Sequence, residues 1–249
     1  IDPIKAAAQR LHYAHEGAIH FGIIPRTNRG IFAINELPDL QPRIQVGLFN
    51  ILEEKDIQIR GFNVRIPLDV MLVFTANPED YTNRGSIITP LKDRIASQIL
   101  THYPKRLDDA LAITEGEAWI DRDCDLPSVQ VPTFMTEIVE EIAFRGRESE
   151  YVDQKSGVSA RLPIAAREIL ASQVERRVLR YPRAAPVPLI VDLARLVPAV
   201  TGKVELVYEG EQEGTLQVAR HLIGAACQAV FDRHFPDAIR EGAESGQAR

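Results

Sequence analysis

The spacing of apolar residues divides the chain into two parts. As far as about residue 103, short apolar runs and alternating segments predict strands interleaved with a helix. Beyond that point strand signals nearly vanish, and prolines and glycines separate five segments with helical spacing. These predicted helices cover about 105–120, 132–147, 159–179, 187–197 and 215–234. We therefore expect an α/β domain over 1–103, a helical domain over 104–240, and a polar tail over 241–249 that frays.

Two apolar runs in the first part predict neighbouring buried strands. Residues 31–34 end at the polar pair Asn35-Glu36, and residues 70–75 end shortly before Asn77. Residues 40–52, which lie between them, have nearly helical apolar spacing and predict a helix packed against the sheet.

Two weaker patterns complete this part. Residues 57–66 alternate apolar and polar side chains around Gly61-Phe62, as in a β-hairpin. Residues 97–101 could supply one further strand.

Polar residues where the strands end are the first candidates for chemistry. Many NTPases place a magnesium ligand and a water-activating base at the exit of a strand, which is the position of Asn35-Glu36. Asn77, at the end of the second strand, could orient the attacking water. The same residues also fit a capped strand end and an Asn that starts a turn. Arg94 ends a short helix, where a ring protein could project it into a neighbour, although a lone surface arginine is usually only solvated.

In order and spacing, these elements resemble AAA+ ATPases of the magnesium-chelatase and MoxR kind. Residues 28–36, Asn-Arg-Gly-Ile-Phe-Ala-Ile-Asn-Glu, resemble the Walker B region of that clade. Residues 75–78 resemble sensor 1, residues 91–94 the arginine-finger segment, and residues 157–161 the sensor 2 start of a lid helix. The resemblance covers about residues 20–180, and the predicted hairpin lies where this clade carries an insertion.

The resemblance implies the C-terminal part of an AAA+ parallel-sheet nucleotide domain followed by an all-helical lid domain. It implies ATP and Mg²⁺ as cofactors, with Asn35 and Glu36 holding the metal indirectly. Glu36 would polarise the attacking water and Asn77 would orient it. Arg94 would reach the γ-phosphate of the adjacent subunit in a ring, expected to be a hexamer, and Arg161 would report the nucleotide state from the lid.

Two departures from the family pattern change what can be expected. Asn35 stands where the family usually has Asp, which should weaken metal binding. The chain also contains no Gly-x-x-x-x-Gly-Lys-[Ser/Thr] phosphate loop, since its nearest match, at 201–203, continues with Val204. We expect the sequence to begin after that loop and the chain alone to be inactive as an ATPase.

Three functions stay open at this point. The first is an ATP-hydrolysing ring motor that remodels an unknown protein client. The second, favoured by Asn35, is a non-hydrolysing scaffold subunit. The third is a nucleic-acid translocase with contacts at Arg60 and Arg65, although the net charge of −6 argues against a dedicated nucleic-acid surface.

Composition and cysteine usage favour a cytoplasmic protein. Cys124 and Cys227 lie far apart with no CxxC or His/Cys cluster, which fits two ordinary thiols in a reducing compartment. No run approaches the roughly 18 consecutive apolar residues that a membrane helix needs, so we expect no membrane insertion.

Overall fold

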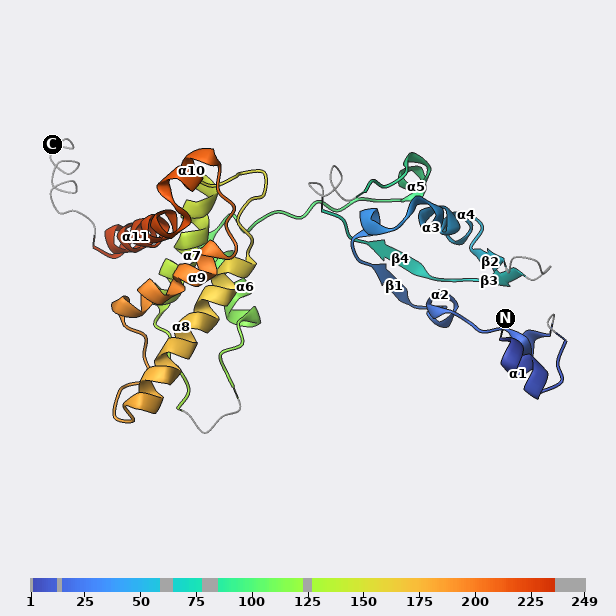
Figure 1. Cartoon of the computed structure of the whole chain (residues 1–249), viewed down its shortest axis with the longest axis horizontal. Helices are drawn as coiled ribbons and strands as arrows, with labels where there is room; N and C mark the ends of the chain where they lie inside the picture. Colours follow the sequence, from blue (N-terminus) through green and yellow to red (C-terminus); the bar gives the residue numbers. More distant parts are fainter. Residues whose placement is uncertain (1, 13–14, 59–64, 78–84, 123–126, 236–249) are drawn as a thin grey trace, which may run out of the picture. The chain divides into compact units, whose positions relative to one another are not determined.

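The computed structural model describes residues 2–12, 15–58, 65–77, 85–122 and 127–235, and it forms two compact units, Ile1–Leu100 and Thr101–Arg249 (Figure 1). Several sequence predictions lie outside the described residues, namely the hairpin turn at Gly61-Phe62, Arg60, Cys124 and the tail over 241–249.

The first unit contains short helices and two small sheets. Its elements are α1 (Pro3–Ala8), η1 (Glu16–Ala18), α2 (Ile23–Arg26), β1 (Ile31–Ile34), η2 (Leu37–Asp39), α3 (Pro42–Gly47), α4 (Phe49–Glu53), β2 (Asp56–Gln58), β3 (Arg65–Pro67), β4 (Met71–Phe74) and α5 (Thr89–Arg94).

Strands β1 and β4 pair in parallel, with Ile31 opposite Met71 and Ile34 opposite Phe74. Both predicted strands are therefore present. Their burial differs from the prediction, because the side chains of Ile31 and Met71 are 67% and 62% exposed. Ile34 and Phe74 face the other way and pack against a core whose fully buried residues come from η2 and α5. The helices thus cover one face of this strand pair. Because successive side chains of a strand point to opposite faces, exposed and half-buried positions alternate along both strands.

Of the predicted hairpin and the predicted helix over 40–52, only the hairpin arms are found in the expected form. The hairpin arms are confirmed, since β2 and β3 pair antiparallel with Ile57 opposite Ile66. The single helix expected over 40–52 is instead two, α3 and α4, which meet at Leu48. The Leu48 N–H donates to the Gln45 carbonyl three residues back at 3.1 Å, and this tighter turn interrupts the α-helical pattern.

The strand expected over 97–101 is wrong. This segment has no regular structure, and Ile99 and Leu100 are 88% and 76% exposed. A strand needs neighbouring backbone groups with which to pair, and this part of the described chain offers the segment none.

The second unit is helical, as predicted. Its elements are α6 (Leu107–Glu117), α7 (Thr133–Glu148), α8 (Arg161–Arg180), η4 (Ile190–Leu196), α9 (Val197–Thr201), α10 (Tyr208–Glu213) and α11 (Thr215–His234). The helix expected over 187–197 is a 3₁₀ helix, η4, and the short helices α9 and α10 have no counterpart among the predictions. No helix in the described part of the chain is long and apolar enough to cross a membrane.

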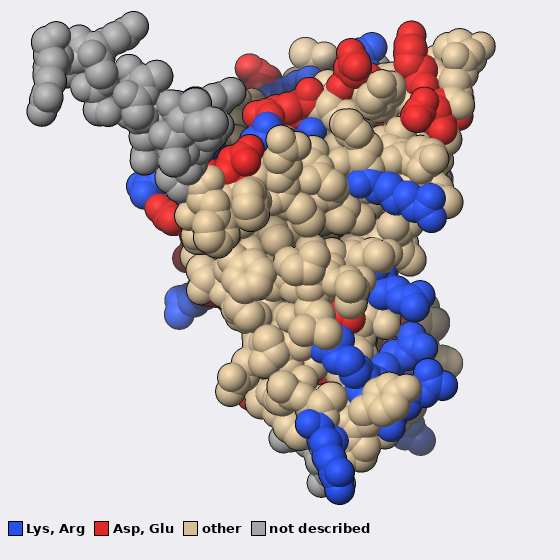
Figure 2. Space-filling model, turned by 90° about the vertical axis from the view of Figure 1, so that its left-hand side faces the viewer, with Lys and Arg blue, Asp and Glu red and all other residues tan. Residues whose placement is uncertain are grey.

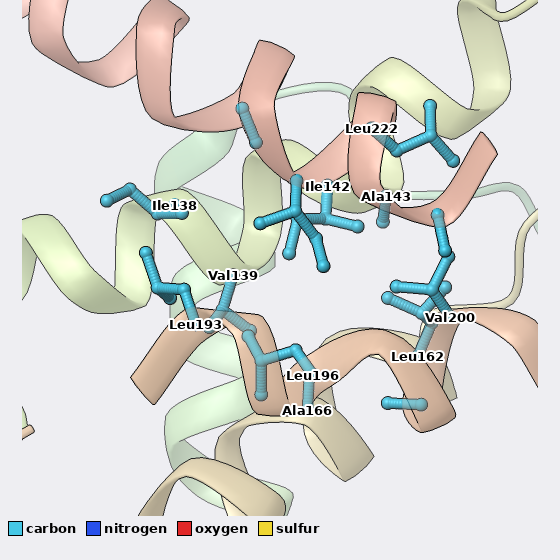
Figure 3. Packing of buried hydrophobic residues seen from close by; sticks show 14 of the residues in the cluster. Ile138, Val139, Ile142, Ala143, Leu162, Ala166, Leu193, Leu196, Val200 and Leu222 are labelled. Carbon is cyan, nitrogen blue, oxygen red and sulfur yellow. The ribbon is translucent and has the colours of Figure 1, made fainter. Parts of the chain in front are cut away.

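One large apolar core holds the helical unit together. It joins inward residues of α7, α8, η4, α9 and α11, and Figure 3 shows Val139 of α7 directed toward Leu193 and Leu196 of η4. Each fully buried large aliphatic side chain contributes about 1.5–3 kcal/mol relative to an exposed one. The first half of α8, which begins with Arg161, packs in this core, whereas Ala171, Val174 and Val178 of its second half pack in a separate cluster with Val129.

Candidate functional site

The carboxyl ends of β1 and β4 are fastened together by Thr75. Its hydroxyl donates to the Asn35 side-chain oxygen and accepts the Glu36 N–H at 3.1 Å. Its backbone completes the contact, since Leu37 N–H donates to the Thr75 carbonyl at 2.9 Å and Thr75 N–H donates to the Ile34 carbonyl at 3.0 Å. Asn35 and Glu36 are thereby held against the segment that carries Asn77.

Sequence reasoning did not single out Thr75 as a site residue. The available signal was a hydroxyl side chain at a strand end, two residues ahead of Asn77. Because one hydroxyl can both donate and accept, Thr75 can join two residues of the neighbouring strand at once. It is therefore a positioning residue for Asn35 and Glu36.

Glu36 has a left-handed backbone, with φ 51° and ψ 59°. Such a conformation costs a non-glycine residue about 1–2 kcal/mol. The Thr75 contacts and the fully buried Leu37 next to it maintain this turn. The Glu36 side chain is half-buried, and its carboxylate makes no hydrogen bond with the described residues, so the carboxylate is available to a bound molecule.

At the end of β1, protein atoms could supply only some of the ligands of a metal ion. No group of three or more His, Cys, Asp or Glu side chains gathers among the described residues as a direct metal site. Asn35 and Glu36 offer one amide oxygen and one carboxylate. That donor set fits Mg²⁺, which keeps several waters and takes other ligands from substrate phosphates.

Arg94, the last residue of α5, is bound within its own unit. Its Nε and Nη2 atoms each lie 2.7 Å from Oε2 of Glu53, and its Nη1 donates to the Pro90 carbonyl at 2.8 Å. The guanidinium also lies over the Phe49 ring, 4.6 Å from its centre. The structure therefore gives Arg94 contacts separate from those that join Asn35, Glu36 and Thr75.

Two residues, Gln45 and Gly85, fix the segment that leads into α5. Gln45 is fully buried and bridges α3 to the segment ahead of α5, donating to the Leu40 and Ser86 carbonyls at 2.8 and 3.1 Å and accepting the Ile88 N–H at 3.0 Å. Gly85 has φ 152°, and a Cβ there would lie 2.3 Å from the Pro38 carbonyl oxygen. Sequence reasoning also missed Gln45, whose helical position gave no sign of its backbone partners.

Arg161 belongs to the second unit, whereas the other four candidate residues belong to the first. It is exposed at the start of α8, where its N–H donates to the Ser159 hydroxyl at 3.1 Å. The preceding turn is fixed, because Arg147 donates to the Val158 carbonyl at 3.0 Å and stacks over the Tyr103 ring at 4.4 Å. Arg161 is thus a free cation, within the described residues, on a rigid support.

Arg65, a contact residue in the nucleic-acid interpretation, is ion-paired with Asp56 at 3.5 Å across β2 and β3. Its side chain is 66% exposed, so it can still reach solvent.

Comparison with known proteins bears on the fold. Residues 12–99 match the family model described as the Sigma-54 interaction domain. Among solved structures, NtrX from Brucella abortus aligns with a TM-score of 0.52 at 16% identity, over 94% of this chain and 50% of that chain. A second structure of NtrX from Brucella abortus, in complex with ADP, aligns with a TM-score of 0.48 at 16% identity, over 91% and 49% of the two chains. The chain thus spans about half the length of these structures. No curated protein sequence matches it.

Together with the parallel strand pair, the family model over residues 12–99 and the first NtrX structure support an AAA+ α/β fold followed by a helical region. The expected AAA+ superfamily is supported. The family model that matches is the Sigma-54 interaction domain, and the findings do not single out the magnesium-chelatase and MoxR branch.

Proposed function

We propose that this chain supplies the hydrolysis and lid elements of an ATP-hydrolysing AAA+ motor subunit. The observation that carries the proposal is the contact of Thr75 with both Asn35 and Glu36, because it puts a free carboxylate beside the segment of Asn77 at one edge of the parallel strands. The proposal requires a phosphate-binding loop, which these 249 residues do not contain.

Each residue has a defined part in the proposed reaction. Glu36 accepts the proton of the attacking water, Asn77 orients that water, and the bond between the γ-phosphorus and the ADP oxygen breaks. Mg²⁺, held through water by Asn35 and Glu36, would neutralise charge on the phosphates. Arg94 acts on the γ-phosphate of the adjacent subunit, and Arg161 binds the nucleotide from the lid. The matching family model and the resemblance to MoxR-like proteins both favour a ring, for which we propose six subunits.

Replacing Glu36 with Gln tests the proposal in a protein that includes a phosphate-binding loop. The amide keeps the shape of the side chain but cannot act as a base, so ATP binding should persist while phosphate release falls by about 100-fold or more. Asp39→Asn, an exposed carboxylate in the same turn, is the matched control and should retain turnover. Unchanged phosphate release in Glu36→Gln would exclude Glu36 as the base.

A second candidate function, a non-hydrolysing scaffold, is favoured by Asn35. Its side-chain oxygen already accepts the Thr75 hydroxyl, and it brings no charge to a metal. Asn35→Asp separates the two functions. If the wild type is a motor, it releases phosphate and Asn35→Asp changes the Mg²⁺ concentration needed. If the wild type is a scaffold, it binds ATP without measurable release.

A further inference from the structure

Four arginine side chains in the last two turns of α8, the segment after it and η4 have no ion pair or hydrogen bond within the described residues. They are Arg176, Arg180, Arg183 and Arg195, and all four are exposed. Five large apolar side chains within residues 179–191 are exposed as well, namely Leu179, Tyr181, Leu189, Ile190 and Val191. We call these nine residues the arginine patch. These five apolar side chains are between 53% and 73% exposed, so more than half of each is open to solvent.

A fifth arginine, Arg177, is used to build this surface. Its Nη1 lies 2.5 Å from Oδ2 of Asp192, and its Nη2 donates to the Val187 carbonyl. Asp192 in turn accepts the Leu189 N–H at 2.7 Å, which fixes the start of η4 against α8. The exposed apolar residues that follow Pro188 therefore stand on a rigid support and cannot fold back into the core.

Charge is distributed unevenly over the helical unit. Figure 2 shows blue Lys and Arg side chains around a largely tan surface at the lower end of this face, whereas red Asp and Glu side chains gather at its upper end. The acidic end includes Glu209, Glu211 and Glu213 of α10. This arrangement repels an acidic partner from α10 and attracts it to the arginine patch.

The composition of the patch indicates which acidic partner it fits. Its cations are all arginines, whose planar guanidinium forks bind carboxylates through two hydrogen bonds. Arg and Tyr are enriched at the centres of protein interfaces, and Lys, which the patch lacks, is depleted there. Nucleic-acid interfaces are more polar and stack bases on aromatic rings, whereas Tyr181 is the one aromatic residue of the patch.

We propose that the arginine patch binds an acidic segment of a partner protein that also carries large apolar side chains. The carboxylates pair with Arg176, Arg180, Arg183 and Arg195, and the apolar side chains cover Leu179 and the start of η4. This interaction goes beyond the proposed ATPase function, because none of its contacts involves nucleotide.

Binding is tested on the 249-residue chain with a fluorescent peptide that alternates Asp or Glu with Leu or Phe, followed by fluorescence anisotropy. Two further peptides, one with Ser for the apolar residues and one with Lys for the acidic residues, separate the contribution of charge from that of apolar burial.

Variants of the patch test which side chains bind the peptide. Arg176→Gln/Arg180→Gln should lower the affinity by about tenfold or more. Lys203→Gln/Arg220→Gln removes the same charge elsewhere on the same unit and should change the affinity less than about twofold. Ile190→Ser/Val191→Ser should weaken binding of the apolar peptide and leave the Ser peptide unchanged.

The same measurement includes a double-stranded DNA and vesicles of phosphatidylserine. Tighter binding of either than of the peptide would overturn the proposal in favour of a nucleic-acid or membrane surface. Absence of peptide binding, or equal losses in the two charge variants, would also overturn it. Circular dichroism of each variant establishes that a loss of binding does not come from unfolding.

Discussion

Arg94 and Glu53 are joined by two 2.7 Å contacts, from Nε and from Nη2 of the guanidinium to one carboxylate oxygen. The side chains are 28% and 56% exposed, so water competes for both partners. Such pairs contribute only about 0.2–1 kcal/mol. The contact therefore holds Arg94 in place in the isolated chain while leaving it able to exchange Glu53 for a stronger anion, such as a phosphate.

Replacement of Glu53 with Gln should loosen Arg94. We expect the modification of Arg94 by an arginine-selective dicarbonyl reagent to accelerate about 2- to 5-fold. Loss of an exposed ion pair raises the population of unpaired Arg94 side chains by about that factor. The rate is measured by mass spectrometry of the labelled peptide, with Arg161 as an internal reference. Glu54→Gln, the exposed neighbour, is the control. An unchanged rate at Arg94 in Glu53→Gln would mean that Phe49 and Pro90 suffice to hold the side chain.

Mixed rings test whether Arg94 acts on its neighbour. In a protein with a phosphate-binding loop, Arg94→Ala and Glu36→Gln subunits should each be inactive in uniform rings. Mixing them creates interfaces that pair an intact Glu36 with an intact Arg94 from the adjacent subunit. We therefore expect partial phosphate release at intermediate ratios. Activity at background across the whole series would remove Arg94 from the neighbour's site.

Gln45 should be essential for the position of α5. Gln45→Leu leaves two part-buried carbonyls and one N–H without their Gln45 partner, at a cost of about 1–3 kcal/mol. Amide hydrogen exchange over residues 85–94 should accelerate about 10- to 100-fold, because this cost raises the population of the locally open state by about that factor. Gln58→Leu, at an exposed position of β2, should leave this exchange unchanged. Equal exchange in the two variants would show that packing of Leu91 alone positions the helix.

Glu140 makes the stability of the helical unit depend on pH. Burial raises the pKa of Glu140 from 4.5 to about 7, an effect that Thr114, Arg147 and Arg167 offset only in part. Between these values the folded state binds more protons than the unfolded state, so stability falls as pH rises from about 4.5 to 7 and then levels.

We expect Glu140→Gln to remove about 1–3 kcal/mol of this loss, measured as the difference from wild type in urea unfolding at pH 5 and pH 8. Trp119, in the same unit, provides the fluorescence signal. Glu213→Gln, an exposed carboxylate on α10, should retain the wild-type slope. Parallel pH profiles for wild type and Glu140→Gln would contradict the raised pKa.

The sequence predicts the elements of this molecule well where periodicity alone determines them. The apolar runs at 31–34 and 70–75 become paired strands, and the longer helical patterns become α7, α8 and α11. The local pattern fails where neighbours decide the outcome. Residues 97–101 include the apolar pair Ile99-Leu100 but have no pairing partner among the described residues. The start of η4 is held by hydrogen bonds of Asp192 with Arg177 and Leu189.

The candidate site follows the same division. Family resemblance selected Asn35, Glu36 and Asn77 from their places at strand ends, and the structure brings the first two against the segment of the third. The hydrogen bonds of Thr75 and the ion pair of Arg94 with Glu53 each join residues about 40 positions apart. No periodicity encodes such a pair, because it depends on register between elements and not on spacing within one.

Helix α8 carries Arg161 at its first residue and Arg176 and Arg180 in its last two turns. At 1.5 Å per residue, its 20 residues make a rod about 30 Å long, whose two halves pack in two apolar clusters. A tilt of this rod moves both ends together. If nucleotide at Arg161 favours one tilt and a partner at the other end favours one as well, the two ligands are thermodynamically linked. Each must then alter the other's dissociation constant by the same factor, whichever binds first.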